Sequence, residues 1–170
     1  MPKTPSLLLR LESFLLCGML LFLLFFPVQS VMAKRPPEIR NQEDLNISSD
    51  MHGQDLSGYE FVKFDLRKID FSDSNLNGAV FNNSKLQGAD LHGADMQDAL
   101  AYASDFEDAD LRDVNFNNAL LMESNFSNAL ISGADFTDAV ISRIQQKQLC
   151  SVADGVNSST GVSTTYSLGC

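Results

Sequence analysis

Few residues in this sequence are of a type that could do chemistry. The chain has three cysteines, Cys17, Cys150 and Cys170, and two histidines, His52 and His92. Such groups bind metals or act as nucleophiles and bases only when they cluster, and none of these stands at the spacing of a metal site or a catalytic triad. No Cys-x-x-Cys pair and no glycine-rich phosphate loop occurs. We therefore expect no enzyme, no metal and no cofactor.

The N-terminus has the order of a secretory signal peptide. Lys3 and Arg10 give a positive n-region, residues 14–26 form an apolar run, and Val31-Met32-Ala33 is a small-x-small cleavage site. The run is short for a membrane span, although an uncleaved N-terminal anchor is the alternative. We expect residues 1–33 to be removed and the rest to be exported, with no membrane association after cleavage.

Removal of the signal peptide takes Cys17 away and leaves Cys150 and Cys170. An even number of cysteines in an exported protein suggests a disulfide. In the chain-entropy model, a disulfide that closes a loop of about 20 residues contributes about 3 kcal/mol. The alternative is a redox-responsive pair that is reduced and reoxidised.

From residue 54 onward an apolar residue returns at every fifth position, and a fixed period is the signature of a repeat architecture. The residue two positions before each of these block centres is usually small, as in Ala89-Asp90-Leu91-His92-Gly93. The centres are Leu56, Phe61, Leu66, Phe71, Leu76, Phe81, Leu86, Leu91, Met96, Ala101, Phe106, Leu111, Phe116, Leu121, Phe126, Ile131, Phe136 and Ile141.

Neither regular secondary structure can bury a strict period of five. In a helix the centres would wander around the cylinder, because five residues advance it by about 500°. In a flat strand they would alternate between the two faces, because five is odd. Both conflicts disappear if the chain turns a corner in every block. The centre and the small residue then face inward, and the polar residues and glycines make the turns.

These blocks resemble those of the pentapeptide repeat family, which read Ala-(Asp/Asn)-Leu-x-x. The resemblance implies an all-β fold, a right-handed, four-sided parallel β-helix with about 20 residues per coil and a short C-terminal helical cap. The tail from Gly161 to Cys170 is similar to that of thylakoid-lumen and periplasmic members of cyanobacteria and chloroplasts. In those proteins, helices and a disulfide close the C-terminal end.

Both ends of the repeat depart from the period, as the caps of a solenoid must. We expect residues 34–53 to form a polar leader and residues 54–143 to form the β-helix. Residues 142–149 are good helix formers, with Ser142 as N-cap. Residues 144–170 should then form the C-terminal cap, which holds Cys150 and Cys170.

Residues 20 apart should stack in successive coils, and one side then carries an acidic ladder of Asp70, Asp90 and Asp110. Stacked like charges repel unless they are hydrated, ion-bound or paired, for example with Arg112. The ladder could be a solvated face, a site for a basic partner or a weak Ca²⁺ site. The net charge of −10 repels phosphates and anionic lipids, so we expect no nucleic-acid partner.

Two further sides have distinct outward residues. One predicts an amide and hydroxyl ladder of Ser57, Asn77, Gln97, Asn117 and Thr137. The other gathers the apolar face, which we define as Val62, Val80, Leu100, Tyr102, Leu120, Met122 and Val140. A contiguous exposed apolar patch usually marks an interface. The alternatives are that the C-terminal helix or tail covers it, or that it reflects ordinary sheet preferences.

These features favour an exported, non-catalytic interaction or scaffold protein of the thylakoid lumen or periplasm. It would bind a protein partner, or a second copy as a homodimer, through the apolar face. One alternative is a redox-responsive stress or regulatory protein that uses Cys150 and Cys170. Another is an acidic DNA mimic that inhibits a topoisomerase, against which the export signal argues because that target is cytoplasmic.

Overall fold

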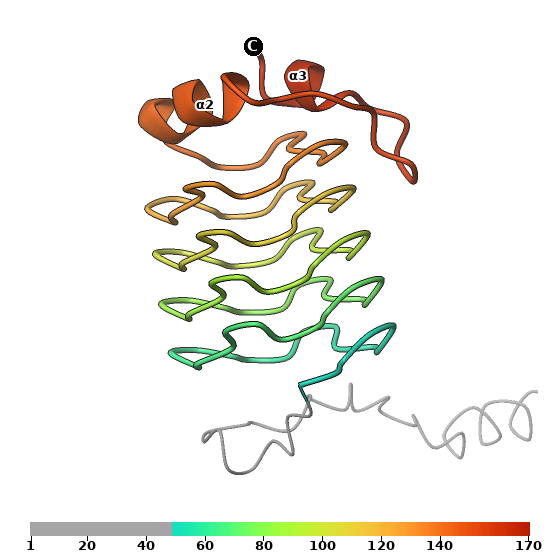
Figure 1. The fold of residues 1–170 in the computed structure, drawn as a ribbon, viewed down its shortest axis with the longest axis vertical. Coiled ribbons are helices and arrows are strands. Elements are labelled where there is room, and N and C mark those ends of the chain that lie inside the picture. The colour runs from blue at the N-terminus through green and yellow to red at the C-terminus, as the bar shows by residue number, and fades with distance from the viewer. Residues whose placement is uncertain (1–48) are drawn as a thin grey trace, which may run out of the picture. The chain divides into compact units, whose positions relative to one another are not determined.

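The fold is a stack of coils, and the computed structural model describes residues 49–170. The predicted signal peptide and residues 34–48 of the predicted leader lie outside the described residues. From Asp50 to Val140 the coils are joined by parallel bridges between residues 20 apart, and they lie one above another in Figure 1. Four bridge positions, five residues apart, recur in each coil, for example Asp70, Asn75, Val80 and Lys85. The predicted 20-residue register is thus observed, and it begins at Asp50, one block before residue 54.

The bridges are isolated, and residues 49–170 contain no continuous β-strand. This differs from a simple all-β expectation, because a corner in every block leaves only one bridged residue on each side of the coil. Main-chain hydrogen bonds still flank each bridge as in a parallel ladder. Leu91 N–H donates to the Asp110 carbonyl at 2.8 Å, and Asp110 N–H donates to the Ala89 carbonyl at 2.9 Å.

Each corner is a β-turn. Ala89 N–H donates to the Leu86 carbonyl at 3.0 Å, and Gly88, the third residue of this turn, has φ +65°. A positive φ at this position alone is the pattern of a type II turn. At Gly93, which has φ +69°, a Cβ would lie 2.5 Å from Asp73 Oδ1, so any larger residue there would displace the Asp73 carboxylate. The prediction that glycines and polar residues make the turns is confirmed.

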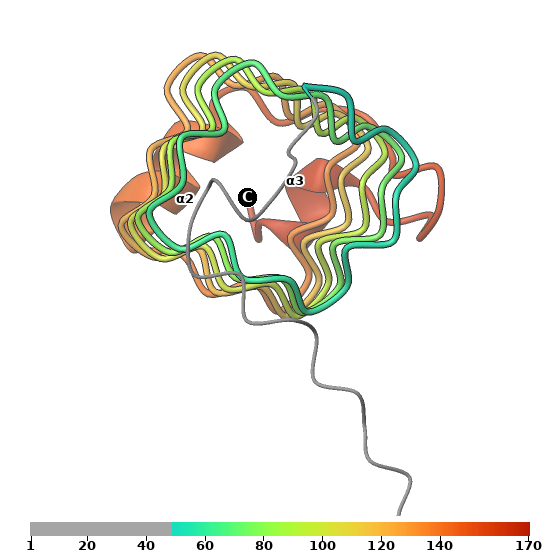
Figure 2. The same ribbon diagram turned by 90° about the horizontal axis from the view of Figure 1, so that it is seen from below.

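The block centres fill the inside of the stack. Phe61, Phe81 and Phe116 are fully buried, and Figure 2 looks along the stack and shows the coils superimposed. Rings in adjacent coils stack face to face, with centroids 4.9 Å apart for Phe61 and Phe81. Small residues such as Ala79 are buried beside them, so the period of five is a packing period, as predicted.

One column of small residues carries buried hydroxyl groups. Ser84, Ser104 and Ser124 each donate through Oγ to the carbonyl of a block centre in the coil below. Ser104 N–H also donates to Ser124 Oγ at 3.0 Å. These hydroxyls are therefore partnered despite their burial, and they link four successive coils through the interior.

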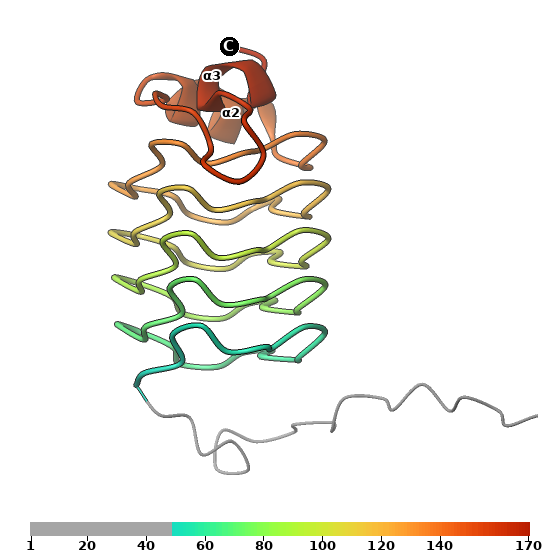
Figure 3. The same ribbon diagram turned by 90° about the vertical axis from the view of Figure 1, so that its right-hand side faces the viewer.

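Two helices close the C-terminal end, α2 at Arg143–Cys150 and α3 at Thr164–Ser167 (Figures 1 and 3). Ser142 is the N-cap of α2, as predicted, and forms a capping box with Gln145. Gln145 N–H donates to Ser142 Oγ at 3.2 Å, and Ser142 N–H donates to Gln145 Oε1 at 2.8 Å. The helix begins one residue before the predicted cap boundary at 144.

A disulfide ties the end of the tail back to the end of α2. Cys150 and Cys170 are bonded, with their Cα atoms 5.7 Å apart. Between them, Val156 and Ser163 form an antiparallel bridge. The bond therefore joins the end of α2 to the C-terminus, where the sequence placed the two cysteines of the cap.

Candidate interaction surfaces

The apolar face is one continuous side of the coil stack. Parallel bridges run from Val80 to Leu100, from Leu100 to Leu120 and from Leu120 to Val140, so these side chains lie in a column. Five of the seven residues on this face are about two-fifths exposed, from 40% at Val62 to 43% at Tyr102 and Leu120. The other two, Val80 and Leu100, are half-buried. Neither α2 nor the tail therefore covers the column.

Polar groups fix Tyr102 within this face. Its N–H donates to Asn82 Oδ1 at 2.9 Å. Its hydroxyl hydrogen-bonds to the carboxylate of Glu123, which raises the pKa of the phenol. The ring therefore stays neutral at physiological pH, and it is available as an apolar contact with a polar edge.

The acidic ladder is present, since parallel bridges connect Asp70 to Asp90 and Asp90 to Asp110. Each carboxylate accepts the N–H two residues ahead, for example Asp90 Oδ1 from His92 N–H at 3.0 Å. The ladder ends at Leu130, which bridges to Asp110 in the next coil. The acidic residues at this position, Asp70, Asp90 and Asp110, thus each have a local structural role.

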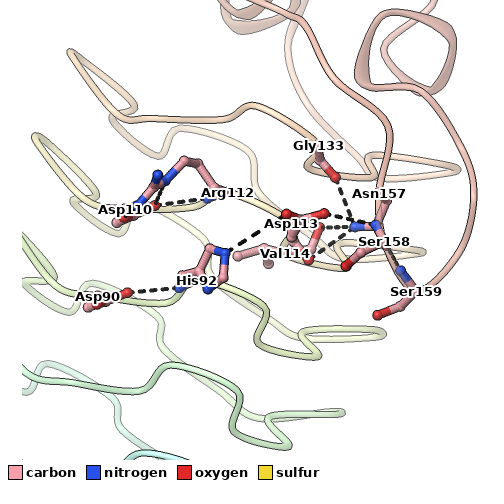
Figure 4. Close-up of polar contacts among 10 residues, drawn as sticks. All are labelled: Asp90, His92, Asp110, Arg112, Asp113, Val114, Gly133, Asn157, Ser158 and Ser159. Carbon is pink, nitrogen blue, oxygen red and sulfur yellow. Dashed lines mark hydrogen bonds and ion pairs between the residues drawn. The ribbon is translucent and has the colours of Figure 1, made fainter.

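Arg112 partly neutralises the ladder. Its guanidinium is 2.5 Å from Asp110 Oδ2 and donates to Asp110 Oδ1 through Nε at 2.9 Å. This hydrogen bond lowers the pKa of Asp110, although burial opposes the shift. On the same side, His92 Nε2 lies 3.9 Å from Asp113 Oδ2. Figure 4 shows both pairs. The predicted pairing with Arg112 is therefore observed.

Side-chain amides form a ladder on a position different from the predicted one. Asn75 Nδ2 donates to Asp55 Oδ1 at 2.9 Å, and Asn115 Nδ2 donates to Asp95 Oδ1 at 3.0 Å. These residues stand just before the block centres, whereas the ladder predicted at Ser57, Asn77, Gln97, Asn117 and Thr137 stands just after them. The correction has a geometric cause, because the residue before the centre is the bridged one and its side chain stacks on its neighbour 20 residues away.

One buried asparagine, which the sequence analysis missed, anchors the tail to the last coils. Asn157 Nδ2 donates to the Gly133 carbonyl at 2.9 Å and to the Asp113 carbonyl at 3.0 Å. Ser158 N–H donates to Asp113 Oδ1 at 2.8 Å. Figure 4 shows this loop lying against the coils beside His92. No sequence signal marks Asn157, because it lies beyond the repeat.

Gln145 of α2 likewise donates to buried main-chain carbonyls, at the end of the column formed by Ser84, Ser104 and Ser124. Its Nε2 donates to the carbonyls of Leu121 and Ser124 at 2.9 and 2.8 Å. The sequence held a signal for this residue, because Ser-x-x-Gln before a helix is a capping box. Within residues 49–170, no group of three or more His, Cys, Asp or Glu side chains could hold a metal ion.

The family described as pentapeptide repeats matches residues 65–100 and 103–143, in eight copies. A pentapeptide repeat protein from the Arabidopsis thaliana thylakoid lumen is 41% identical, with 71% of this chain and 90% of that chain covered and a TM-score of 0.29. This chain is a pentapeptide repeat protein.

The solved structure of another pentapeptide repeat protein, Rfr23 from the cyanobacterium Cyanothece 51142, has a TM-score of 0.54 at 22% identity. The match covers 59% of this chain and 69% of Rfr23, and it supports the fold alone. No curated protein sequence matches this chain. Pentapeptide repeat proteins fold as right-handed quadrilateral β-helices, and the four bridge positions per coil agree with four sides.

Among residues 49–170, no helix is long and apolar enough to cross a membrane. The predicted signal peptide lies outside this range.

Proposed function

We propose that this protein is an exported, non-catalytic scaffold, built as a right-handed four-sided β-helix, that binds a protein partner or a second copy through the apolar face. The observation that carries the proposal is the column of Val80, Leu100, Leu120 and Val140, flanked by the exposed side chains of Tyr102 and Met122. Leu120 and Val140 are exposed, whereas Val80 and Leu100 are half-buried. Monomeric proteins rarely leave such a contiguous apolar patch in water without a binding role.

Two features support a protein as the ligand of this face. Tyrosine and methionine are enriched where proteins meet, because they offer large contact areas with adaptable or polar edges. The strong net negative charge of the chain disfavours nucleic acid and anionic lipid surfaces. Acidic residues such as Glu60 and Glu123 lie beside the apolar face, and they would favour a partner with a basic rim.

The proposed compartment is the thylakoid lumen or the periplasm. The order of residues 1–33 supports export, and the 41% identical relative comes from a thylakoid lumen. N-terminal sequencing of the protein recovered from that compartment tests the cleavage. A first residue of Lys34 is expected, whereas an intact N-terminus would favour a membrane anchor.

Redox regulation is a second candidate function, and one observation favours it. The disulfide joins the cap to an exposed C-terminal residue, Cys170, so a reductant could reach it. A measured reduction potential above that of ordinary structural disulfides, which lie below about −300 mV, would support this reading. A lower potential would contradict it.

The scaffold proposal is tested with Leu100→Asn/Leu120→Asn. The fold should tolerate asparagine there, because Asn75 and Asn115 occupy the same position on another side and accept the N–H two residues ahead. A Leu100→Asp/Leu120→Asp variant replaces the same two leucines with charged side chains of similar size to asparagine. Asn77→Asp/Asn117→Asp, on the side of the amide ladder, is the matched control.

The measurement is size-exclusion chromatography with light scattering, together with capture from an extract of the native compartment. We expect wild type and the control to dimerise or to retain one partner in a fixed ratio, and both Leu100/Leu120 variants to lose it. If the folded Leu100/Leu120 variants behave as wild type does, the apolar face is not the binding surface.

A further inference from the structure

A slot lies between the last coil and the cap helix α2. Its volume is about 600 Å³, within the range of sites that hold small ligands or short peptide segments. The floor is formed by residues 126–132 of the last coil, and Gln148, Leu149 and Val152 line it from the cap. The slot exists because α2 replaces the coil that would otherwise continue the stack at this side.

The floor of the slot has main-chain donors without acceptors. In the coil below, Phe106 N–H and Leu111 N–H each donate at 2.8 Å to a carbonyl one coil above. In the last coil the donors of this kind without a hydrogen-bond partner among residues 49–170 include the N–H groups of three residues, Phe126, Asn128 and Ile131. All three residues line the slot. The slot therefore offers an open coil edge that requires carbonyl oxygens in an extended chain.

The ring of Phe126 gives the edge a side-chain preference. It stacks on Phe106 below it with centroids 5.3 Å apart, and Phe106 is fully buried. Phe126 is only partly buried, and no ring lies above it within residues 49–170. Leu130 and Val152 are both more than half exposed at the slot. An apolar or aromatic side chain could therefore continue the stack of rings.

The charges at the slot do not select an ionic ligand. Arg112 lines it, but its guanidinium is already bound by both carboxylate oxygens of Asp110. The other charged lining residue is Asp154. An anionic ligand would gain no free counter-ion here, and the open main-chain donors carry no net charge, so we expect a neutral segment.

We propose that the slot binds a short, uncharged, extended peptide segment of a partner protein. Its main-chain carbonyls would accept hydrogen bonds from Phe126, Asn128 and Ile131 N–H, as the next coil does elsewhere in the stack. One apolar or aromatic side chain would lie on the Phe126 ring. This is strand addition at an open edge, in which the main chain gives affinity and a side-chain pocket gives specificity. The proposal does not depend on the apolar face.

The test uses an acetylated and amidated peptide, Ser-Asn-Phe-Ser-Asn, which copies a neutral block of this chain, residues 124–128. It is titrated into ¹⁵N-labelled protein purified after secretion, with amide shifts and hydrogen exchange measured by NMR. We expect the Phe126, Asn128 and Ile131 amides to shift and their exchange to slow. The peptide Ser-Asn-Ala-Ser-Asn should produce smaller changes at the same concentration.

Two variants of α2 locate the binding. Gln148→Trp should fill the slot and abolish the changes, whereas Lys147→Trp, on the same helix but outside the lining, should leave them intact. Absent shifts, shifts confined to another surface, equal effects of the two peptides or unchanged binding by Gln148→Trp would each overturn the proposal. If Gln148→Trp does not fold, the comparison of the two peptides on wild type decides.

Discussion

At the scale of single residues, the position before each block centre does two tasks. An Asp or Asn there accepts the N–H two residues ahead, as Asp95 does from Gln97 at 3.1 Å. It also stacks on its equivalent in the next coil, where Asn115 donates to Asp95. The position is therefore polar for a local reason. Leu100 and Leu120 depart from this rule where a partner is expected, and Leu130 departs from it on the side of the acidic ladder.

Asp135 has an unsatisfied oxygen that a single substitution should relieve. The residue is buried, its Oδ1 accepts from Thr137 N–H and Oγ1, and its Oδ2 has no partner among the described residues. Asp135→Asn keeps Oδ1 and puts an amide where it can donate to Asn115. We expect the free energy of unfolding to rise by about 1 kcal/mol, measured by chemical denaturation. A decrease in the free energy of unfolding would contradict this account.

The Asp110–Arg112 pair predicts a pH dependence. The hydrogen bond from Arg112 lowers the folded-state pKa of Asp110, so the folded state binds this proton less readily than the unfolded chain does. The pair therefore stabilises the fold above the ordinary Asp pKa of about 3.9, and its effect disappears as the pH falls through the lowered value.

Arg112→Gln should accordingly lower the unfolding midpoint slightly at neutral pH and leave it unchanged in strong acid. Arg143→Gln, on α2, serves as a charge-matched control. The measurement is denaturation across the acid range, and a difference between wild type and Arg112→Gln that persists in strong acid would refute the assigned cause.

At the scale of elements, the cap depends on side chains that take the place of a missing coil. Gln145→Ala removes two hydrogen bonds to buried carbonyls and one half of the capping box. We expect a loss of about 1–3 kcal/mol in the free energy of unfolding. Gln148→Ala, on an exposed position of the same helix, is the control and should cost much less. Equal losses would show that Gln145 has no special role.

The disulfide should stabilise the cap rather than the shaft. It closes a segment with a sequence separation of 20, for which the chain-entropy model gives about 3 kcal/mol. Cys150→Ser/Cys170→Ser should therefore speed hydrogen exchange at α2, α3 and Asn157 while Phe71 and Phe81 stay protected. Loss of protection throughout the shaft would contradict a local role.

At the scale of the whole molecule, much of the fold could be predicted from the sequence because the period of five repeats without a break. The centres and the turns follow from steric rules that act within one block. The 20-residue register follows from the resemblance to the pentapeptide repeat family, and Ser142 follows from the preference for serine at a helix N-cap. The path of the tail could not be predicted, because Asn157 contacts Gly133 through a unique loop without a repeated pattern. The slot was also missed, since it arises where α2 fails to continue the coil.

The apolar face was identifiable before the structure because residues 20 apart stack, and its exposure rests on where the tail goes. Asn157 and Ser158 hold the tail beside Asp113, and Leu120 and Val140 stay exposed on the apolar face. Export, the partner and the mode of association are proposals that experiments on the native compartment must test.

The most direct test of the scaffold proposal is photo-crosslinking from within the apolar face in the living cell. A benzoylphenylalanine replaces Tyr102 in one strain and Asn77, on a different side of the stack, in another. We predict one discrete crosslinked product from position 102, either a partner or a second copy, and none from position 77. Its loss with Leu120→Asn would strengthen the assignment. No product from position 102, or the same products from both positions, would contradict the account.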